Sequence, residues 1–199
     1  MVPEIPDGPA LPAFARQAGL SRLDLNLPNL ITLARLLCVP LAIWLIVEAR
    51  YGVAFWVFVL AGLSDALDGY IAKRWDQRTP LGAILDPIAD KALLAGVYIT
   101  LGLAGELPQW LVILVVLRDL LIVGGYLLSH GATPPQPLFI SKVNTLVQIA
   151  LVGFVLARLG LTIEAGFVTA LFIAAAGVTT VCSGLSYLVH WARLLVRWN

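Results

Sequence analysis

The chain has 199 residues, of which 60% are hydrophobic and only 13% are charged, and its mean hydropathy is +0.91. A water-soluble globular domain rarely shows this balance, so the composition predicts a protein that resides in a lipid bilayer. The formal net charge of +1 argues against a broad basic surface that binds nucleic acid. Both cysteines fall inside apolar runs, which favours small hydrophobic side chains over a disulfide or a metal site.

The apolar runs predict an all-α integral membrane fold with six transmembrane helices. A membrane span needs ~20 mostly apolar residues, and glycine, proline and charged residues separate the runs. The predicted spans are residues 30–47, 53–72, 85–103, 110–128, 138–157 and 167–189. Residues 11–27 carry two arginines among apolar side chains, as an interfacial amphipathic helix would. We therefore expect an N-terminal segment (1–27), one six-helix domain (28–193) and a short tail (194–199).

The flanking cations predict the orientation of these spans. With an even number of spans, both termini lie on one side, and that side collects eight cations: Arg16, Arg22, Lys73, Arg74, Arg78, Lys142, Arg193 and Arg197. The other side receives two, Arg50 and Arg158. The positive-inside rule then places both termini in the cytoplasm. The N-terminus resembles neither a secretory signal nor a transit peptide, so we expect the chain to begin near Met1 and to lie in a bacterial inner membrane.

Several charged residues fall within the predicted spans, where each costs roughly 2.5 to 3.5 kcal/mol on insertion scales. They are Arg35, Asp65, Asp68, Asp86, Asp90, Lys91, Arg118 and Asp119. Four of the aspartates lie within a 26-residue window, in pairs spaced i,i+3 and i,i+4, which puts each pair on one helical face. Small residues continue these faces, so the pattern predicts a hollow lined by carboxylates in the cytoplasmic half of the bilayer.

A cluster of four carboxylates without histidine or cysteine favours Mg²⁺, Mn²⁺ or Ca²⁺. Four such ligands suffice for two divalent ions of the kind used in phosphoryl chemistry. One alternative is a set of structural ion pairs, in which Lys91 or Arg35 neutralises one aspartate each. Another is a divalent-cation transporter or binding protein that uses the same aspartates.

The string SDALDGYIAKRWDQRTPLGAILDPIADK has the spacing DxxDGxxA[K], eight residues, then GxxxDxxxD. It resembles the signature of the CDP-alcohol phosphatidyltransferase family, DxxDGxxAR, eight or nine residues, then GxxxDxxxD. Lys73 stands where that family usually has arginine, which keeps the charge but loses the bidentate fork. The strings NLPNLITLARLLCVPL, VLRDLLIV and FISKVNTLVQ are most similar to the CMP-forming cardiolipin synthase branch.

This resemblance implies a mechanism and a set of metal ligands. In that family six helices surround a cytoplasm-facing cavity, usually in a homodimer, and two divalent metals hold the pyrophosphate of a CDP-linked lipid. By position, Asp65, Asp68 and Asp86 would be metal ligands, and Asp90 would be both metal-linked and the general base. The cofactors would be two Mg²⁺ or Mn²⁺ ions.

Other residues are candidates for contacts with the two substrates. The predicted contacts with the nucleotide and the CDP-lipid are Asn29, Thr32, Arg35, Gly69, Ala72, Lys73 and Gly82. For the first three, the alternative is helix capping and a snorkelling arginine. The predicted contacts with the acceptor are Arg118, Lys142 and Asn144, although Arg118 could instead form an interhelical pair. As sequence neighbours, Arg118 and Asp119 are expected to face different ways.

The expected function is the transfer of a phosphatidyl group from CDP-diacylglycerol to phosphatidylglycerol, giving cardiolipin and CMP. The alternative within the family is a phosphatidylglycerophosphate synthase that uses glycerol 3-phosphate. The expected partners are these lipid substrates, the surrounding membrane lipids and a second copy of the chain, with no nucleic acid.

Overall fold

The computed structural model describes residues 27–74, 80–128 and 139–197, and within these ranges it describes the side chains of residues 31–64, 89, 91–124 and 139–189. All of the described secondary structure is helical. The six helices are α2 (Leu27–Val47), α3 (Tyr51–Arg74), α4 (Pro80–Leu103), α5 (Gln109–Leu128), α6 (Phe139–Gly160) and α7 (Gly166–Arg197).

These helices coincide with the six predicted apolar runs, because runs of this length and hydrophobicity satisfy their backbone hydrogen bonds internally only as helices. The largest difference is at the C-terminus, where α7 continues to Arg197 rather than ending at residue 189. Its 32 residues make it about 48 Å long, which exceeds a hydrocarbon core of ~30 Å. The predicted interfacial helix, residues 11–27, lies outside the described residues except for Leu27.

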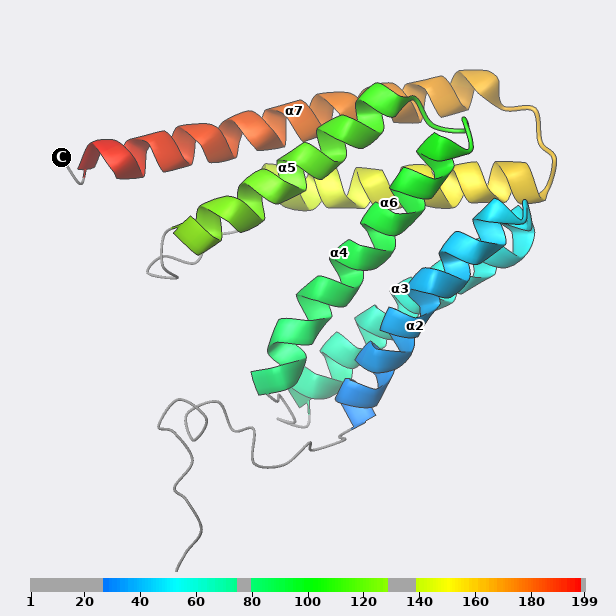
Figure 1. The fold of residues 1–199 in the computed structure, drawn as a ribbon, viewed down its shortest axis with the longest axis horizontal. Coiled ribbons are helices and arrows are strands. Elements are labelled where there is room, and N and C mark those ends of the chain that lie inside the picture. Colours follow the sequence, from blue (N-terminus) through cyan, green and yellow to red (C-terminus); the bar gives the residue numbers. More distant parts are fainter. Residues whose placement is uncertain (1–26, 75–79, 129–138, 198–199) are drawn as a thin grey trace, which may run out of the picture.

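The helices form two groups that meet at one end and diverge at the other (Figure 1). Helix α2 packs against α3 and α4, α7 packs against α5 and α6, and α3 joins the groups by packing against α6. The short connections 48–50, 104–108 and 161–165 gather at the end where the groups meet. The end of α3 and the start of α4 lie at one diverging end, and the end of α5 and the start of α6 lie at the other.

Helices α2, α4 and α6 all end in the same kind of turn, with one residue in the left-handed conformation. These residues are Ala49 (φ 54°), Gly105 (φ 81°) and Thr162 (φ 52°). In each case the next residue donates its N–H to a carbonyl in the last turn of the helix, as Glu106 does to Leu101 at 2.9 Å. This arrangement satisfies the last carbonyl groups and fixes a tight reversal into the next helix.

The core lies where the two groups meet. Its fully buried side chains include Ile46, Val97, Leu101, Leu151 and Val155, which come from α2, α4 and α6. Helices α3 and α6 make backbone contact here, because a Cβ atom placed on Gly160 would lie 2.6 Å from the Cα atom of Gly52. Two glycines thus allow these helices to approach closely, as is common between membrane helices.

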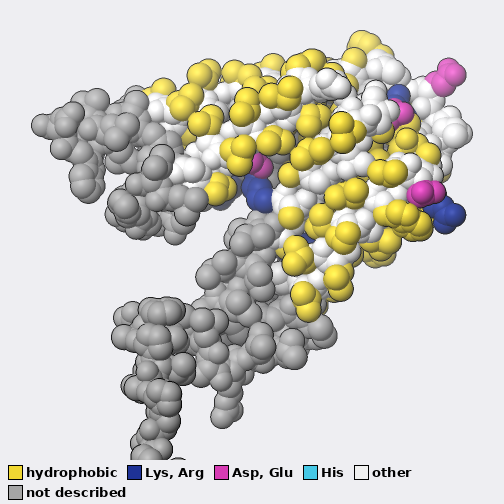
Figure 2. Space-filling model, viewed as in Figure 1, with side chains coloured by type: hydrophobic (Ala, Val, Ile, Leu, Met, Phe, Trp, Pro, Cys, Tyr) yellow, Lys and Arg dark blue, Asp and Glu magenta, His cyan; other side chains and the backbone are white. Residues whose placement is uncertain are grey.

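The outer surface of the described helices is strongly apolar. Large side chains such as Leu37, Val47, Trp56 and Phe167 are at least half exposed, and hydrophobic side chains spread over both helix groups (Figure 2). Within the described residues, two helical stretches are long and apolar enough to cross a bilayer, Phe139–Gly160 and Gly166–Val189. Shorter apolar stretches occur at Ile31–Val47, Tyr51–Ser64 and Lys91–Leu103. A surface of this kind is typical of contact with lipid.

Candidate active site

Both halves of the aspartate motif lie in helices. Asp65 and Asp68 fall near the end of α3, and Asp86 and Asp90 fall near the start of α4. The helical backbone places each pair about one turn apart. The five residues 75–79 connect the helices and can span at most about 20 Å, so the end of α3 and the start of α4 stay close together.

The side chains of the four aspartates lie outside the described residues, so their predicted roles as metal ligands and as general base stay predictions. The same holds for five predicted contacts with the nucleotide and CDP-lipid: Asn29, Gly69, Ala72, Lys73 and Gly82.

Lys91 directly follows the motif and forms an ion pair with α5. Its Nζ atom donates to both carboxylate oxygens of Asp119, at 3.1 Å and 3.0 Å. The Lys91 side chain is 43% exposed and that of Asp119 is 18% exposed, so the pair lies at the edge of the buried region. Lys91 therefore forms an ion pair with an aspartate on α5 that lies outside the motif.

Arg118 is the centre of a buried polar network that joins α5, α6 and α7. Its side chain is 3% exposed, and it donates to Asp119 at 2.6 Å, to Ser183 at 2.8 Å and 3.1 Å, and to Ser141. The guanidinium carbon also lies 5.8 Å from the ring centroid of Tyr187, within the range of a cation–π interaction. This network holds the guanidinium in one place.

The prediction that Arg118 and Asp119 face different ways is wrong. Adjacent helical residues do start in different directions, but the long arginine side chain turns back and reaches the short carboxylate beside it. Arg118 forms its ion pair within α5, with Asp119. The ion pair between helices is the one that Asp119 forms with Lys91 of α4.

The N-terminal half of α2 contributes two buried polar side chains to the interior. Thr32 and Arg35 are each 2% exposed, and Arg35 lines a cavity between the helices. A snorkelling arginine would reach the surface, so that alternative is wrong for Arg35. Its burial agrees with the predicted position near the CDP-linked substrate.

Asn144 and Gln148 form a polar contact between α6 and α7. The Oδ1 atom of Asn144 accepts hydrogen bonds from Thr179 at 2.9 Å and Thr180 at 2.8 Å, and Gln148 Nε2 donates to Thr180 Oγ1 at 3.2 Å. Both side chains are fully buried. The Nε2 atom of Gln148 and the Oδ1 atom of Asn144 therefore both form hydrogen bonds between helices.

Lys142 and Asn144, both predicted to contact the acceptor, lie on different sides of α6. Lys142 is exposed, whereas Asn144 is buried against α7. The structure thus brings Arg118 close to α6 and α7 but leaves Lys142 at the surface near the start of α6.

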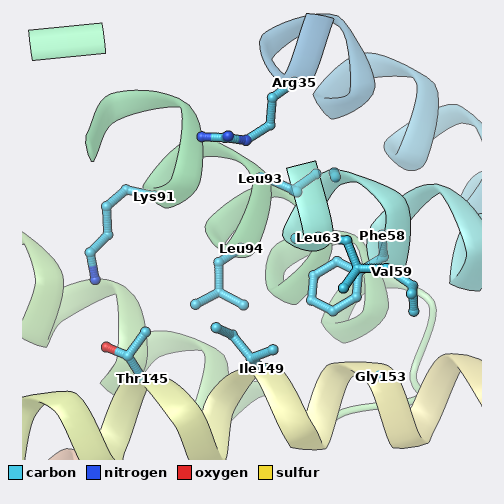
Figure 3. A pocket seen from close by; sticks show the side chains of 12 residues that line it. Arg35, Phe58, Val59, Leu63, Lys91, Leu93, Leu94, Thr145, Ile149 and Gly153 are labelled. Carbon is cyan, nitrogen blue, oxygen red and sulfur yellow. The ribbon is translucent and has the colours of Figure 1, made fainter. Parts of the chain in front are cut away.

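A cavity of about 480 Å³ lies between α3, α4 and α6, next to the motif helices. Figure 3 shows the Lys91 nitrogen and the Thr145 hydroxyl on one side, and Phe58, Val59 and Leu63 on the other. Most of the lining is aliphatic or aromatic. The cavity therefore has a cationic end and an apolar body.

The sequence also matches a known family model. The model described as CDP-alcohol phosphatidyltransferase matches residues 25–192, which include all six helices except the last residues of α7. The chain belongs to the CDP-alcohol phosphatidyltransferase family. Its members are membrane proteins, in agreement with the apolar surface and the two long apolar helices of this one.

Three relatives represent the range of similar proteins. "Cardiolipin synthase (CMP-forming)" of Rattus norvegicus is 34% identical over 86% of this chain and 63% of the relative. The protein of the same name from Streptomyces coelicolor is 37% identical over 70% of this chain and 68% of the relative. "Probable phosphatidylglycerophosphate synthase" of Mycobacterium tuberculosis is 33% identical over 92% of this chain and 90% of the relative. The chain thus spans less than two thirds of the rat relative's length.

The donor set of this phosphatidyltransferase motif fits a hard divalent cation, since it offers four carboxylates and neither histidine nor cysteine. Among the side chains that the structure describes, no three His, Cys, Asp or Glu residues gather to form another metal site. The cation that an ion-pair interpretation assigned to a motif aspartate, Lys91, is bound by Asp119. A metal site at the motif therefore stays a prediction from the sequence.

Three residues of α7 that contact polar side chains of α5 and α6 were not among the predicted site residues. Thr180, Ser183 and Tyr187 are spaced i,i+3 and i,i+7, and all three are buried. Polar residues at helical spacing in an apolar run are a signal of an inward-facing stripe. In the sequence, the alanine and glycine residues that precede Thr180 favour an interpretation as close helix packing.

Proposed function

We propose that this chain transfers a phosphatidyl group from CDP-diacylglycerol to the hydroxyl group of phosphatidylglycerol, giving cardiolipin and CMP. The observation that carries the proposal is the complete aspartate motif on α3 and α4, in a chain whose relatives include CMP-forming cardiolipin synthases. The VLRDLLIV and FISKVNTLVQ strings point to the same branch. Family membership leaves the cation-transporter alternative without a supporting observation.

In the proposed reaction, the acceptor hydroxyl oxygen forms a bond to the β-phosphorus, which bears the diacylglycerol. The bond from that phosphorus to the oxygen bridging to CMP breaks, and CMP leaves with the bridging oxygen. Asp90 accepts the proton of the acceptor hydroxyl. Two Mg²⁺ or Mn²⁺ ions held by Asp65, Asp68, Asp86 and Asp90 would supply charge neutralisation at the diphosphate.

The remaining groups of the chain bind and orient the substrates in this proposal. Arg35 and Lys73 would bind the CDP group, and the buried Arg118 would provide a fixed positive charge for the acceptor phosphodiester. Asp119 and two serines hold the Arg118 guanidinium, so little side-chain entropy is lost when an anion binds.

A second candidate function is phosphatidylglycerophosphate synthesis, with glycerol 3-phosphate as acceptor. It is favoured by the Mycobacterium tuberculosis relative, which this chain matches over 90% of its length. Both candidates require the same donor, the same motif and the release of CMP.

An acceptor assay tests both candidates. Purified chain receives CDP-diacylglycerol, Mg²⁺ or Mn²⁺ and one acceptor at a time, and CMP and the lipid product are measured. We expect CMP and cardiolipin with phosphatidylglycerol. CMP with glycerol 3-phosphate alone would establish the second candidate, and no CMP with either acceptor would contradict the proposed function.

We also propose that all six helices cross a bacterial inner membrane, with both termini and the motif ends of α3 and α4 on the cytoplasmic side. The excess of cations at those ends and the relatives from two bacteria support this orientation. A homodimer is the expected assembly, and light scattering of the purified protein with detergent correction measures it.

A further inference from the structure

We propose that Ser183 and Tyr187 of α7 are positioning residues for the acceptor, because they turn the Arg118 guanidinium so that its Nη1 atom faces the motif helix α4. This inference rests on the proposed function, since it takes the phosphate group of the acceptor as the partner of Arg118. It goes further by giving α7, which carries no part of the aspartate motif, a role in binding the acceptor.

Helix α7 contacts the Arg118 side chain at three places. A Cβ atom placed on Gly184 would lie 3.8 Å from the Arg118 Cγ atom, which is ordinary van der Waals contact. The Ser183 hydroxyl accepts hydrogen bonds from Nε at 3.1 Å and from Nη2 at 2.8 Å. The ring of Tyr187, one helical turn further along α7, has its centroid 5.8 Å from the guanidinium carbon. One face of α7 therefore contacts both the stem and the guanidinium of Arg118.

Ser183 occupies the Nε edge of the guanidinium, where two N–H groups point in parallel and could otherwise bind an anion. The second N–H of Nη2 donates to Ser141, and one N–H of Nη1 donates to Asp119. A guanidinium has five N–H groups. Among the residues that the structure describes, one N–H group of Nη1 is therefore left without a partner, and it can donate to a phosphate oxygen.

The Nη1 atom lies on the more open side of the network. Ser183 is fully buried, whereas the Asp119 side chain, which accepts from Nη1, is 18% exposed. Lys91 of α4 contacts the same carboxylate and is 43% exposed. Both Nη1 and the Lys91 Nζ atom donate to Asp119 Oδ1, at 2.6 Å and 3.1 Å. Nη1 thus lies next to the helix that carries Asp90.

The charges of this network favour an anionic ligand. Lys91 and Arg118 each carry one positive charge and Asp119 carries one negative charge, so one positive charge is not balanced among the three. Excess charge away from water is unfavourable, and an anion beside Nη1 would offset it. Phosphatidylglycerol and glycerol 3-phosphate both carry a phosphate group. The inference therefore holds for either candidate acceptor.

In this proposal Ser183 and Tyr187 act only through Arg118. An arginine side chain that is free to move loses entropy when an anion orders it, and this loss weakens binding. Because the serine and the tyrosine hold the guanidinium before the acceptor binds, that loss is small. Removing either residue should weaken acceptor binding and leave the chemical step unchanged.

The first test measures steady-state kinetics of Ser183→Ala with the acceptor that supports CMP release. We expect KM for the acceptor to rise about three- to tenfold, the range for a side chain that must be ordered on binding. KM for CDP-diacylglycerol and kcat should change less than about twofold, because donor contacts and chemistry are unaffected. Ser186→Ala is the matched control, because that hydroxyl donates to the Cys182 carbonyl of its own helix.

A double-mutant cycle tests whether Ser183 acts through Arg118. In an Arg118→Lys background, Ser183→Ala should change the acceptor KM by less than about twofold, because lysine has no guanidinium edge to orient. Tyr187→Leu, which removes the ring, should raise the same KM in the unchanged background, and the conservative variant Tyr187→Phe should restore it. The tyrosine pair gives a result even if Ser183→Ala does not fold.

The outcomes separate this inference from the proposed function. If the unchanged protein releases no CMP with any acceptor, the proposed function fails. If it is active and both Ser183→Ala and Tyr187→Leu keep the original acceptor KM, the positioning role is wrong. The role is also wrong if KM for the donor rises as much as KM for the acceptor. An equal effect of Ser183→Ala in the Arg118→Lys background would likewise overturn it.

Discussion

Asp119 contacts two cations, Lys91 and Arg118, and so joins the motif helix α4 to the polar interior of α5, α6 and α7. The guanidinium is 3% exposed, so it depends on its partners rather than on water. Removing one partner of a buried ion pair leaves the other charge buried without a counter-charge, and this lowers the stability of the fold more than removing both partners does.

We predict that Asp119→Ala lowers the free energy of unfolding by about 3 kcal/mol or more, because the Arg118 charge stays buried without its carboxylate. Thermal unfolding in detergent measures the change. Glu106→Ala is the matched control, because its ion pair with Arg158 lies at the other end of the bundle and is more exposed, at 27% and 21%. The control should lose no more than about 1 kcal/mol. Equal losses in the two variants would contradict the special role of Asp119.

Asp90 is the residue at which the proposed chemistry takes place. We predict that Asp90→Asn lowers kcat by about 10² to 10⁴-fold, because an amide cannot accept the acceptor proton. Binding of CDP-diacylglycerol, measured by calorimetry in detergent, should remain detectable. If Asp90→Asn turned over at the rate of the unchanged protein, Asp90 would not be the general base.

At the scale of helices, the contact between α3 and α6 depends on Gly160. A Cβ atom at this position would overlap the backbone of Gly52, whereas a Cβ atom on Gly52 would make ordinary contact with Gly160, at 3.7 Å. Backbone cannot give way as the end of a flexible side chain can. This contact connects the two helix groups near the closed end of the bundle.

We predict that Gly160→Ala lowers the free energy of unfolding by about 1 to 3 kcal/mol, as overpacking does in other interiors. Its Cβ atom would lie 2.6 Å from the Cα atom of Gly52 and 2.7 Å from its nitrogen. Thermal unfolding in detergent tests this. Gly124→Ala is the control, because its Cβ would meet nothing within 4 Å and stability should change little. If Gly124→Ala lost as much stability as Gly160→Ala, the contact with Gly52 would not be the cause.

At the scale of the whole molecule, the closed end and the diverging ends of the bundle differ in their chemistry. The connections 48–50, 104–108 and 161–165 at the closed end are short and tightly capped. The end of α3 and the start of α4, which carry the motif, lie at a diverging end. The proposed orientation places the closed end outside the cytoplasm.

This orientation predicts a labelling pattern for single cysteines in a background with Cys38→Ser and Cys182→Ser. Glu164→Cys, in the connection between α6 and α7, should react with a membrane-impermeant maleimide added outside intact cells. Lys142→Cys, exposed near the start of α6, should react only after the cells are opened. The reverse pattern would show that the bundle is inverted.

The sequence by itself determined the six helices, the aspartate motif and its division between two adjacent helices. These features depend on local hydrophobicity and spacing, so one chain contains the information. The chemistry of the motif aspartates stays a prediction from sequence, since their side chains lie outside the described residues.

Only the tertiary structure decided which polar groups meet. Asp119 binds Lys91, which is 28 positions away, and Arg118 binds Ser183, which is 65 positions away. It also showed that Arg35 is buried and that a cavity lies between helices α3, α4 and α6. Partners so distant in the chain are selected by how the helices pack, and the hydrophobicity of each helix fixes its existence but not its neighbours.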